Sequence, residues 1–368
     1  MTSALVFIAV IIALIVVHEF GHFIAAKLSG MRVDEFGLGY PPRALTLGKI
    51  GETEYTLNWL PFGGFVKIFG EDGSSEGSGA AHPRAFSARP RILQAVVLVA
   101  GIAMNLLFAY VLLTGALMMG TPRALSPGEV ASAEHKELAV ANVLAGSPAS
   151  RAGLTPGDSI LGAHDAAGTW GAADPTSFTT YVAASGGEAI TLEVKHNGEM
   201  TSLVATPERG IVSSDPTRYA LGVEVATIGI VPLSFTAALT EGATLTWETT
   251  VLTAQGLAHF FYGIMTFSAD LSQVAGPVGI AGVVGSASSQ GLGDLFSIMA
   301  IISINLALIN LIPVPALDGG RLLFVLIEGV IRRPIKPQLA QTINAIGFAL
   351  LILLMVVVTA HDIFKILG

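Results

Sequence analysis

Four long apolar runs, separated by polar segments, predict helices that cross a membrane. They are residues 4–26, 92–122, 295–317 and 343–360. The first is unbroken from residue 4 to residue 17, and the second and third carry no charged residue at all. Each run is long enough, at the rise of an α-helix, to span a hydrocarbon core of about 30 Å. The pattern therefore predicts four transmembrane helices.

The first run has one alternative interpretation, a cleaved signal peptide. No Lys or Arg precedes it, and no clean small-residue cleavage site appears before the first charge. A signal peptide has both a basic residue before its apolar run and such a cleavage site after it. We therefore expect the run to remain as a membrane helix.

Residues 249–269 also lack acidic and basic side chains, and they could be mistaken for a fifth span. Threonine, glutamine and histidine interrupt the segment and make it too polar for a transmembrane span. Its apolar residues suit an amphipathic helix that lies on the membrane or packs on the helix bundle. Such a helix and a following loop are expected within residues 230–290.

The distribution of Lys and Arg predicts the orientation. Eight lie between the first and second spans and four follow the third span, whereas residues 121–293 contain only six. Basic residues favour the cytoplasmic side. We expect a protein of the cell (inner) membrane, with both termini and the long segment outside the cytoplasm.

The segments between the spans show β-strand patterns. Short strands separated by Gly and Pro are expected at residues 33–38, 44–47, 54–59 and 64–68. This β-loop is apolar enough to dip into the membrane. In the outer segment, strands at 190–196 and 201–206 flank Asn197-Gly198, a strong hairpin signal. A short helix at 147–154 and a turn at 155–158 complete a compact mixed domain.

Composition agrees with a membrane protein. Of the 368 residues 52% are hydrophobic and 12% charged, about half the charge of a typical soluble chain, and mean hydropathy is +0.68. Cysteine is absent, which excludes disulfides, a thiolate nucleophile and Cys-ligated metals. A net charge of −8 argues against nucleic acid as a partner.

The first predicted span contains a group suited to metal chemistry. His18 and His22 are four residues apart and so project from one helical face, with Glu19 between them. In metalloproteases this pattern binds zinc through the two histidines and uses the glutamate as general base. Ionisable side chains inside a membrane helix are costly and usually functional. We therefore predict zinc ligands at His18 and His22 and a catalytic base at Glu19.

Catalytic zinc usually has three protein ligands, and Asp318 is the best candidate for the third. It follows Asn310 at the end of the third run. At 1.5 Å per residue, His18 and Asn310 lie about 22 and 24 Å from the outer ends of their helices. Two helices that run in the same direction thus bring their polar groups to the same depth, near the cytoplasmic side.

Taken together, these motifs resemble the site-2 protease family of intramembrane zinc metalloproteases, most closely its bacterial sigma-E regulator protease branch. The matching segments are His18-Glu-Phe-Gly-His22, Leu60-Pro-Phe-Gly-Gly-Phe-Val-Lys67, the Asn105 segment, Gly276-Pro-Val-Gly-Ile280 and Asn310 to Gly320. The outer segment resembles a PDZ domain through its turn at 152–158 and through Tyr219-Ala-Leu-Gly-Val223, which is similar to a carboxylate-binding loop.

The resemblance implies roles for particular residues. Asp318 would be the third zinc ligand, and Asn310 would hold the substrate backbone or the developing oxyanion. The β-loop, including Gly63 and Gly64, would present the unwound substrate as an added strand. Further substrate contacts are implied for Asn105 and for Leu221, Gly222 and Val223. The chain departs from the family in lacking the usual Gly-Pro before Asn105 and in having room for one PDZ-like domain instead of two.

The expected fold is a polytopic α-helical membrane protein with four transmembrane helices, a membrane-associated β-loop and one extracytoplasmic PDZ-like α+β domain. Its parts are a transmembrane helix in 1–30, the β-loop in 31–70, a cytoplasmic linker in 71–90, a second transmembrane helix in 91–120, the PDZ-like domain in 128–225, the amphipathic helix and loop in 230–290 and two transmembrane helices in 293–368.

The expected activity is cleavage of single-span membrane proteins that have already been shortened outside the membrane, such as an anti-sigma factor or a signal-peptide remnant. Zinc lowers the pKa of bound water from 15.7 to about 7, and Glu19 would accept the proton. Two alternatives stay open at this point. One is a CAAX-type membrane metalloprotease, which would use a different third ligand. The other is a PDZ-containing membrane scaffold with a structural zinc, although such a site has no need of Glu19.

Overall fold

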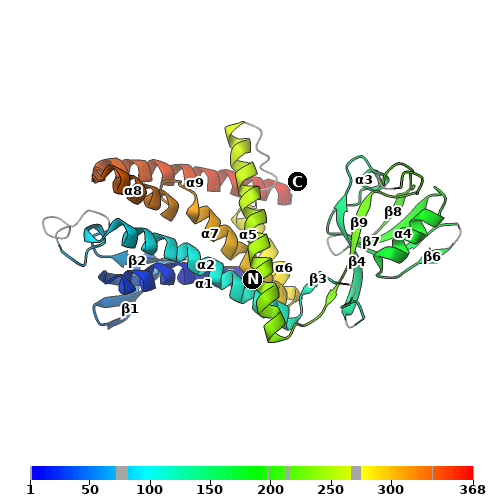
Figure 1. Ribbon diagram of the computed structural model, residues 1–368. Coiled ribbons are helices and arrows are strands. Elements are labelled where there is room, and N and C mark those ends of the chain that lie inside the picture. The colour runs from blue at the N-terminus through cyan, green and yellow to red at the C-terminus, as the bar shows by residue number, and fades with distance from the viewer. Residues whose placement is uncertain are drawn as a thin grey trace. The chain divides into compact units, whose positions relative to one another are not determined.

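The computed structural model describes residues 2–71, 82–126, 128–131, 133–166, 168–196, 199–212, 215–266, 275–333 and 335–367 (Figure 1). The chain forms two compact units. The first combines Met1–Met119 with Ser234–Gly368, and the second is Gly120–Leu233.

The first unit is built mainly from helices. They are α1 (Thr2–Leu28), α2 (Arg91–Met119), α5 (Phe235–Met265), α6 (Pro277–Gln290), α7 (Leu292–Leu311), α8 (Asp318–Ile331) and α9 (Pro337–Leu367), with a short 3₁₀ helix at Phe86–Ala88. In Figure 1, α1 and α2 run side by side. Apolar side chains from α1, α2, α6 and α7 form a common core that includes Leu14, Leu112, Val284 and Ile304.

Four helices among the described residues are long and apolar enough to cross a membrane. They are Ser3–Leu28, Arg91–Met119, Leu292–Leu311 and Gln338–Lys365. The prediction of four long apolar helices that could span a membrane is therefore confirmed. The chain is an integral membrane protein.

The polar segment near residue 249 belongs to a longer helix than expected, because α5 extends over Phe235–Met265. It packs on α2 and α7 within the first unit. The contact with α2 is close: a Cβ added to Gly242 would lie 2.5 Å from the Thr114 hydroxyl oxygen. The Tyr110 hydroxyl donates to the Leu239 carbonyl at 3.3 Å.

The β-loop consists of two bent strands, β1 (Val33–Ile50) and β2 (Thr53–Ile68). Each strand bends, so that its two halves form separate segments of the sheet. Across the sheet these four segments lie in the order 43–50, 53–58, 33–38 and 64–68. These correspond to the four short strands expected from the sequence. Gly39 and Gly63 lie at the bends with φ of 80° and 107°, a conformation that favours glycine.

Half of the expected cytoplasmic linker, residues 72–81, lies outside the described part of the chain. Of its remainder, Arg84 forms an ion pair with Glu52 of the β-loop. The Arg32 backbone N–H donates to the Arg84 carbonyl at 3.0 Å. These contacts attach the segment before α2 to the β-loop.

The second unit is a sheet with two helices. Its strands are β3 (Pro122–Ala124), β4 (Glu134–Val143), β5 (Ser159–His164), β6 (Thr169–Trp170), β7 (Ile190–His196), β8 (Glu199–Ala205) and β9 (Val223–Ile230), and its helices are α3 (Pro148–Ala152) and α4 (Pro175–Ala184). The strand order is β3-β9-β4-β5-β7-β8, with β6 beside β5. Phe178, Ile190, Leu192 and Leu221 are buried in its own core.

The hairpin expected around Asn197-Gly198 is formed by β7 and β8, which pair from Ile190 with Ala205 to His196 with Glu199. The two turn residues themselves lie outside the described residues. The long strand β4 and the helix α4 were not expected from the sequence. Both have mixed polar and apolar patterns, and packing in the sheet core decides their structure.

Candidate active site

Two helices far apart in the sequence bring three metal-ligating side chains together. The Nε2 atoms of His18 and His22 lie 3.2 Å apart on α1. Oδ2 of Asp318, the first residue of α8, is 2.9 Å from the His18 Nε2 and 3.1 Å from the His22 Nε2. Helical spacing of four residues explains why both imidazoles share one face.

The loop between α7 and α8 determines where Asp318 lies. The glycines after it permit an unusually tight turn: a Cβ at Gly319 would lie 2.3 Å from the Ile312 carbonyl oxygen, and one at Gly320 would lie 2.4 Å from that of Val314. Any larger residue would push α8 away from the loop. The Leu-Asp-Gly-Gly sequence is therefore needed to bring the carboxylate back to α1.

The three ligating atoms fit a zinc ion. They lie within 4.8 Å of one another, and both histidines are buried. Ligands about 2.1 Å from a tetrahedral zinc are separated by about 3.4 Å, close to the distances seen here. Two imidazole nitrogens and one carboxylate oxygen form a donor set typical of catalytic zinc, which leaves a fourth position for water or substrate.

Helix α2 contacts both histidines at their Nδ1 atoms, whereas their Nε2 atoms face Asp318. The His22 Nδ1 lies 2.8 Å from the Val97 carbonyl, and the His18 Nδ1 lies 3.2 Å from the Asn105 side-chain nitrogen. Between them, a Cβ at Gly101 would lie 2.4 Å from the His22 Nε2. Sequence reasoning did not assign Val97 or Gly101 to the site. The available signal was their spacing of four residues, which matches that of the histidines.

Glu19 lies between the ligand cluster and the β-loop. A Cβ at Gly64 would be 3.5 Å from the Glu19 Cγ. Gly64 begins the segment 64–68 at one edge of the sheet, and Gly63 precedes it with a φ of 107°. Gly64 is thus placed next to the predicted base, and Gly63 lies directly before it in the chain.

Asn310 also lies at the site, near the end of α7. Its side-chain nitrogen is 3.5 Å from the His18 Nε2. The residue is partly exposed, whereas Asn105 is fully buried. An amide beside the ligand cluster can donate hydrogen bonds to a peptide oxygen bound there.

Leu221, Gly222 and Val223 belong to the second unit, so the structure does not group them with the histidines. The Leu221 and Gly222 carbonyls accept hydrogen bonds from the Ala149 and Leu144 N–H groups. Gly222 has a φ of 78°, and Val223 starts β9. Their role in carboxylate binding stays a prediction.

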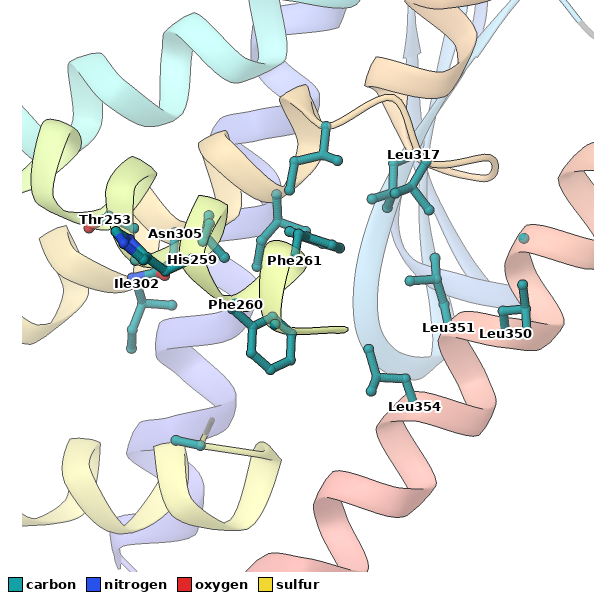
Figure 2. Close-up of a pocket in the computed structure, with 18 of the residues that line it drawn as sticks. Thr253, His259, Phe260, Phe261, Ile302, Asn305, Leu317, Leu350, Leu351 and Leu354 are labelled. Carbon is teal, nitrogen blue, oxygen red and sulfur yellow. The ribbon is translucent and has the colours of Figure 1, made fainter. Parts of the chain in front are cut away.

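An open cavity of about 1490 Å³ lies beside the loop that carries Asp318 (Figure 2). Helices α5, α6, α7 and α9 line it with mostly apolar side chains, among them Phe260, Ile302 and Leu350. Leu317, the residue before Asp318, reaches its wall. The three ligands are not part of the lining, so the cavity adjoins the metal site without containing it.

Comparison with known proteins gives a consistent result. The sequence model of peptidase family M50 matches residues 6–354. A Clostridium perfringens protein described as "Putative zinc metalloprotease" is 36% identical over 354 residues, covering 95% of each chain. A Synechocystis protein with the same description is 35% identical over 361 residues, covering 98% of this chain and 94% of the relative. Zinc metalloprotease RasP of Shouchella clausii is 28% identical over 444 residues, covering 99% of each.

Proposed function

The chain belongs to peptidase family M50, the site-2 protease family, and we propose that it hydrolyses peptide bonds in or near the transmembrane segments of single-span membrane proteins. That it is a zinc metalloprotease, as predicted from the sequence, is confirmed by the family and by the names of its relatives. The observation that carries the proposal is the cluster of His18, His22 and Asp318 on a membrane-spanning helix and the loop packed against it.

The proposal assigns a role to each residue of the site. His18, His22 and Asp318 hold the zinc, which supplies Lewis-acid activation of water and of the peptide carbonyl when bound. Glu19 accepts a proton from the attacking water and then gives it to the leaving amine. Asn310 donates to the oxygen on which charge develops.

The position of Gly64 supports substrate binding by strand addition. Segment 64–68 pairs with 33–38 on one side and begins beside Glu19. An extended peptide that pairs with its other side would pass the proposed base, with main-chain hydrogen bonds to hold it. A transmembrane helix must unwind locally to do so, because its peptide groups are already hydrogen-bonded to one another.

The apolar cavity supports a lipid-facing route for the rest of the substrate. Its wall combines residues of α5, α6, α7 and α9 and includes Leu317, next to Asp318. The apolar side chains of a transmembrane segment suit such a lining. We assign the cavity to the part of the substrate that remains helical.

The proposed topology places the site near the cytoplasmic side and the second unit outside. Basic residues between α1 and α2 and after α7 support this orientation. We regard the second unit as PDZ-like. We regard the substrates of the whole protein as membrane proteins already shortened outside the membrane. Release of a signalling domain or removal of a signal-peptide remnant would then be the biological outcome.

The decisive experiment compares membrane proteomes of cells that carry the native protein or Glu19→Gln. Single-span proteins should accumulate uncut in the variant, and their fragments should appear only with the native protein. A Gly329→Ala variant on α8 serves as control, since a Cβ there meets nothing within 4 Å and the residue does not line the cavity. Identical proteomes for all three proteins would overturn the proposal.

A further inference from the structure

Helix α2 presents a row of three residues to the histidines of α1, each four positions from the next. Val97 faces the Nδ1 of His22 at 2.8 Å, and Asn105 faces the Nδ1 of His18 at 3.2 Å. Gly101 lies between them, where its missing side chain leaves room for both rings. The Nδ1 atom of each imidazole thus has a partner on the same helix.

The ligand cluster determines which nitrogen of each ring carries the proton. The Nε2 atoms of both histidines point at Asp318 and at one another. A neutral imidazole that offers its Nε2 lone pair to a metal keeps its proton on Nδ1. Each Nδ1–H therefore needs an acceptor, and the Val97 carbonyl provides one for His22.

For His18, the acceptor must come from the Asn105 amide. Its nitrogen is the atom placed nearest to the His18 Nδ1, while its Oδ1 is buried without a hydrogen-bond partner. A rotation of 180° exchanges the two amide atoms and moves no other atom. It turns the carbonyl oxygen towards the Nδ1–H.

We infer that Asn105 is a positioning residue whose Oδ1 accepts the Nδ1–H of His18 and so fixes the tautomer in which Nε2 binds zinc. The inference rests on the proposed function, which makes His18 a ligand. Asn105 is 0% exposed, so its side chain contacts His18 and is not accessible to a bound substrate. Its backbone carbonyl accepts a 2.8 Å hydrogen bond from the hydroxyl of Ser303, which ties this level of α2 to α7.

The test measures zinc affinity of the full-length protein, stripped of metal in detergent, by competition with a chelator. Asn105→Leu removes the acceptor and should weaken zinc binding about 10- to 100-fold. Asn105→Asp keeps an acceptor oxygen and should bind zinc at least as tightly as the native protein. Asn305→Leu on α7 is the matched control, because the amide of Asn305 bonds to the Ile301 carbonyl of its own helix. Its zinc affinity should not change.

Two outcomes would overturn the inference. Native zinc affinity in Asn105→Leu together with slower cleavage would indicate direct substrate contact, the role expected from the sequence. Equal weakening in Asn105→Leu and Asn105→Asp would indicate packing alone. If the Leu variant does not fold, weaker zinc binding by Asn105→Asp than by the native protein still overturns the inference. Failure of the proposed function is recognised separately, by native zinc affinity in His18→Ala.

Discussion

The Nε2 atom of His18 lies 2.9 Å from Oδ2 of Asp318, although the two residues are 300 positions apart in the chain. One is on a membrane-spanning helix and the other begins a short helix after a tight loop. No local structure connects them, so their contact depends on the packing of the whole helical unit. The role of each residue in the cluster can be tested by replacing it alone and measuring zinc content and cleavage.

The first prediction separates the zinc ligands from the base. His22→Ala and Asp318→Ala should lose both zinc and cleavage, because each removes one of three ligands. Glu19→Gln should retain near-stoichiometric zinc and lose cleavage by about 10²- to 10⁴-fold, because it removes only the proton acceptor. Metal content by atomic emission and cleavage in detergent give both readouts. Full activity in Asp318→Ala would show that the third ligand is a different residue.

The second prediction concerns the close approach of α2 to the histidines. In Gly101→Ala the new methyl group would lie 2.4 Å from the His22 Nε2 and 2.9 Å from the His18 Cε1, so both rings must move. Zinc affinity and cleavage should fall together. Gly115→Ala is a control on the same helix, where the nearest atom is a Phe296 ring carbon at 3.3 Å.

Helix propensity does not obscure this comparison. Alanine stabilises a helix relative to glycine by about 1 kcal/mol at either position. Gly115→Ala should therefore keep or raise the midpoint of thermal unfolding of the metal-free protein, whereas in Gly101→Ala the displaced histidine rings offset that gain. Equal zinc affinity in the two variants would contradict the geometry described for α2.

The sequence predicted this site better than it predicted what supports it. The spacing of His18 and His22 on an apolar helix predicts that they share one face, and equal depth in two parallel helices made Asp318 the best candidate for a third member of the cluster. Gly101 and Val97 gave no comparable signal, since a glycine or valine in a membrane helix is ordinary. Their importance comes from the distance between two helices, which no single stretch of sequence encodes.

The β-loop shows the same limit. The sequence predicted its four short strands, because alternating residues and glycines mark each segment. Their order in the sheet was not predicted, since it requires β1 and β2 to bend so that 33–38 pairs on both sides. That order is what leaves segment 64–68 at an edge beside Glu19.

The third prediction tests strand addition at this edge. Gly64→Val would place a branched side chain beside Glu19, in space that a bound peptide needs. We expect KM to rise and zinc content to stay native, because the three ligands are unchanged. Thr46→Val alters an exposed residue on the opposite edge segment and should leave KM as it is. An unchanged KM in Gly64→Val would argue against substrate binding along this edge.

The fourth prediction concerns topology. The chain has no cysteine, so single cysteines at the exposed positions Ser87 and Ser150 report on their own surroundings. A membrane-impermeant thiol reagent applied from outside should label Ser150→Cys and spare Ser87→Cys until the membrane is opened. Equal labelling in intact cells would contradict the proposed orientation.

The last prediction concerns the second unit, which is expected on the same side of the membrane as a substrate ectodomain. A zinc site in the membrane has little side-chain selectivity of its own, so another part of the protein must discriminate against intact membrane proteins. We predict that this unit acts mainly as a size filter. The alternative is that Leu221, Gly222 and Val223 capture the new terminal carboxylate of a shortened substrate.

Two changes distinguish these roles. Replacing residues 121–232 by a flexible Gly/Ser linker removes the whole unit, including β3 and β9, and leaves no strand without its partner. Gly222→Val keeps the bulk but disrupts the loop, because a Cβ there would lie 2.4 Å from the Ser147 Cβ and φ is 78°. Gly168→Ala, where a Cβ meets nothing within 4 Å, is its control.

Each protein is assayed with a full-length substrate and with one shortened outside. If the unit filters by size, the linker variant should cut the full-length substrate faster, and Gly222→Val should behave like Gly168→Ala and the native protein. If it captures carboxylates, both the linker variant and Gly222→Val should cut the shortened substrate more slowly. Rates that are unchanged in every combination would contradict both roles, because a unit with its own buried core would then have no influence on which proteins reach Glu19.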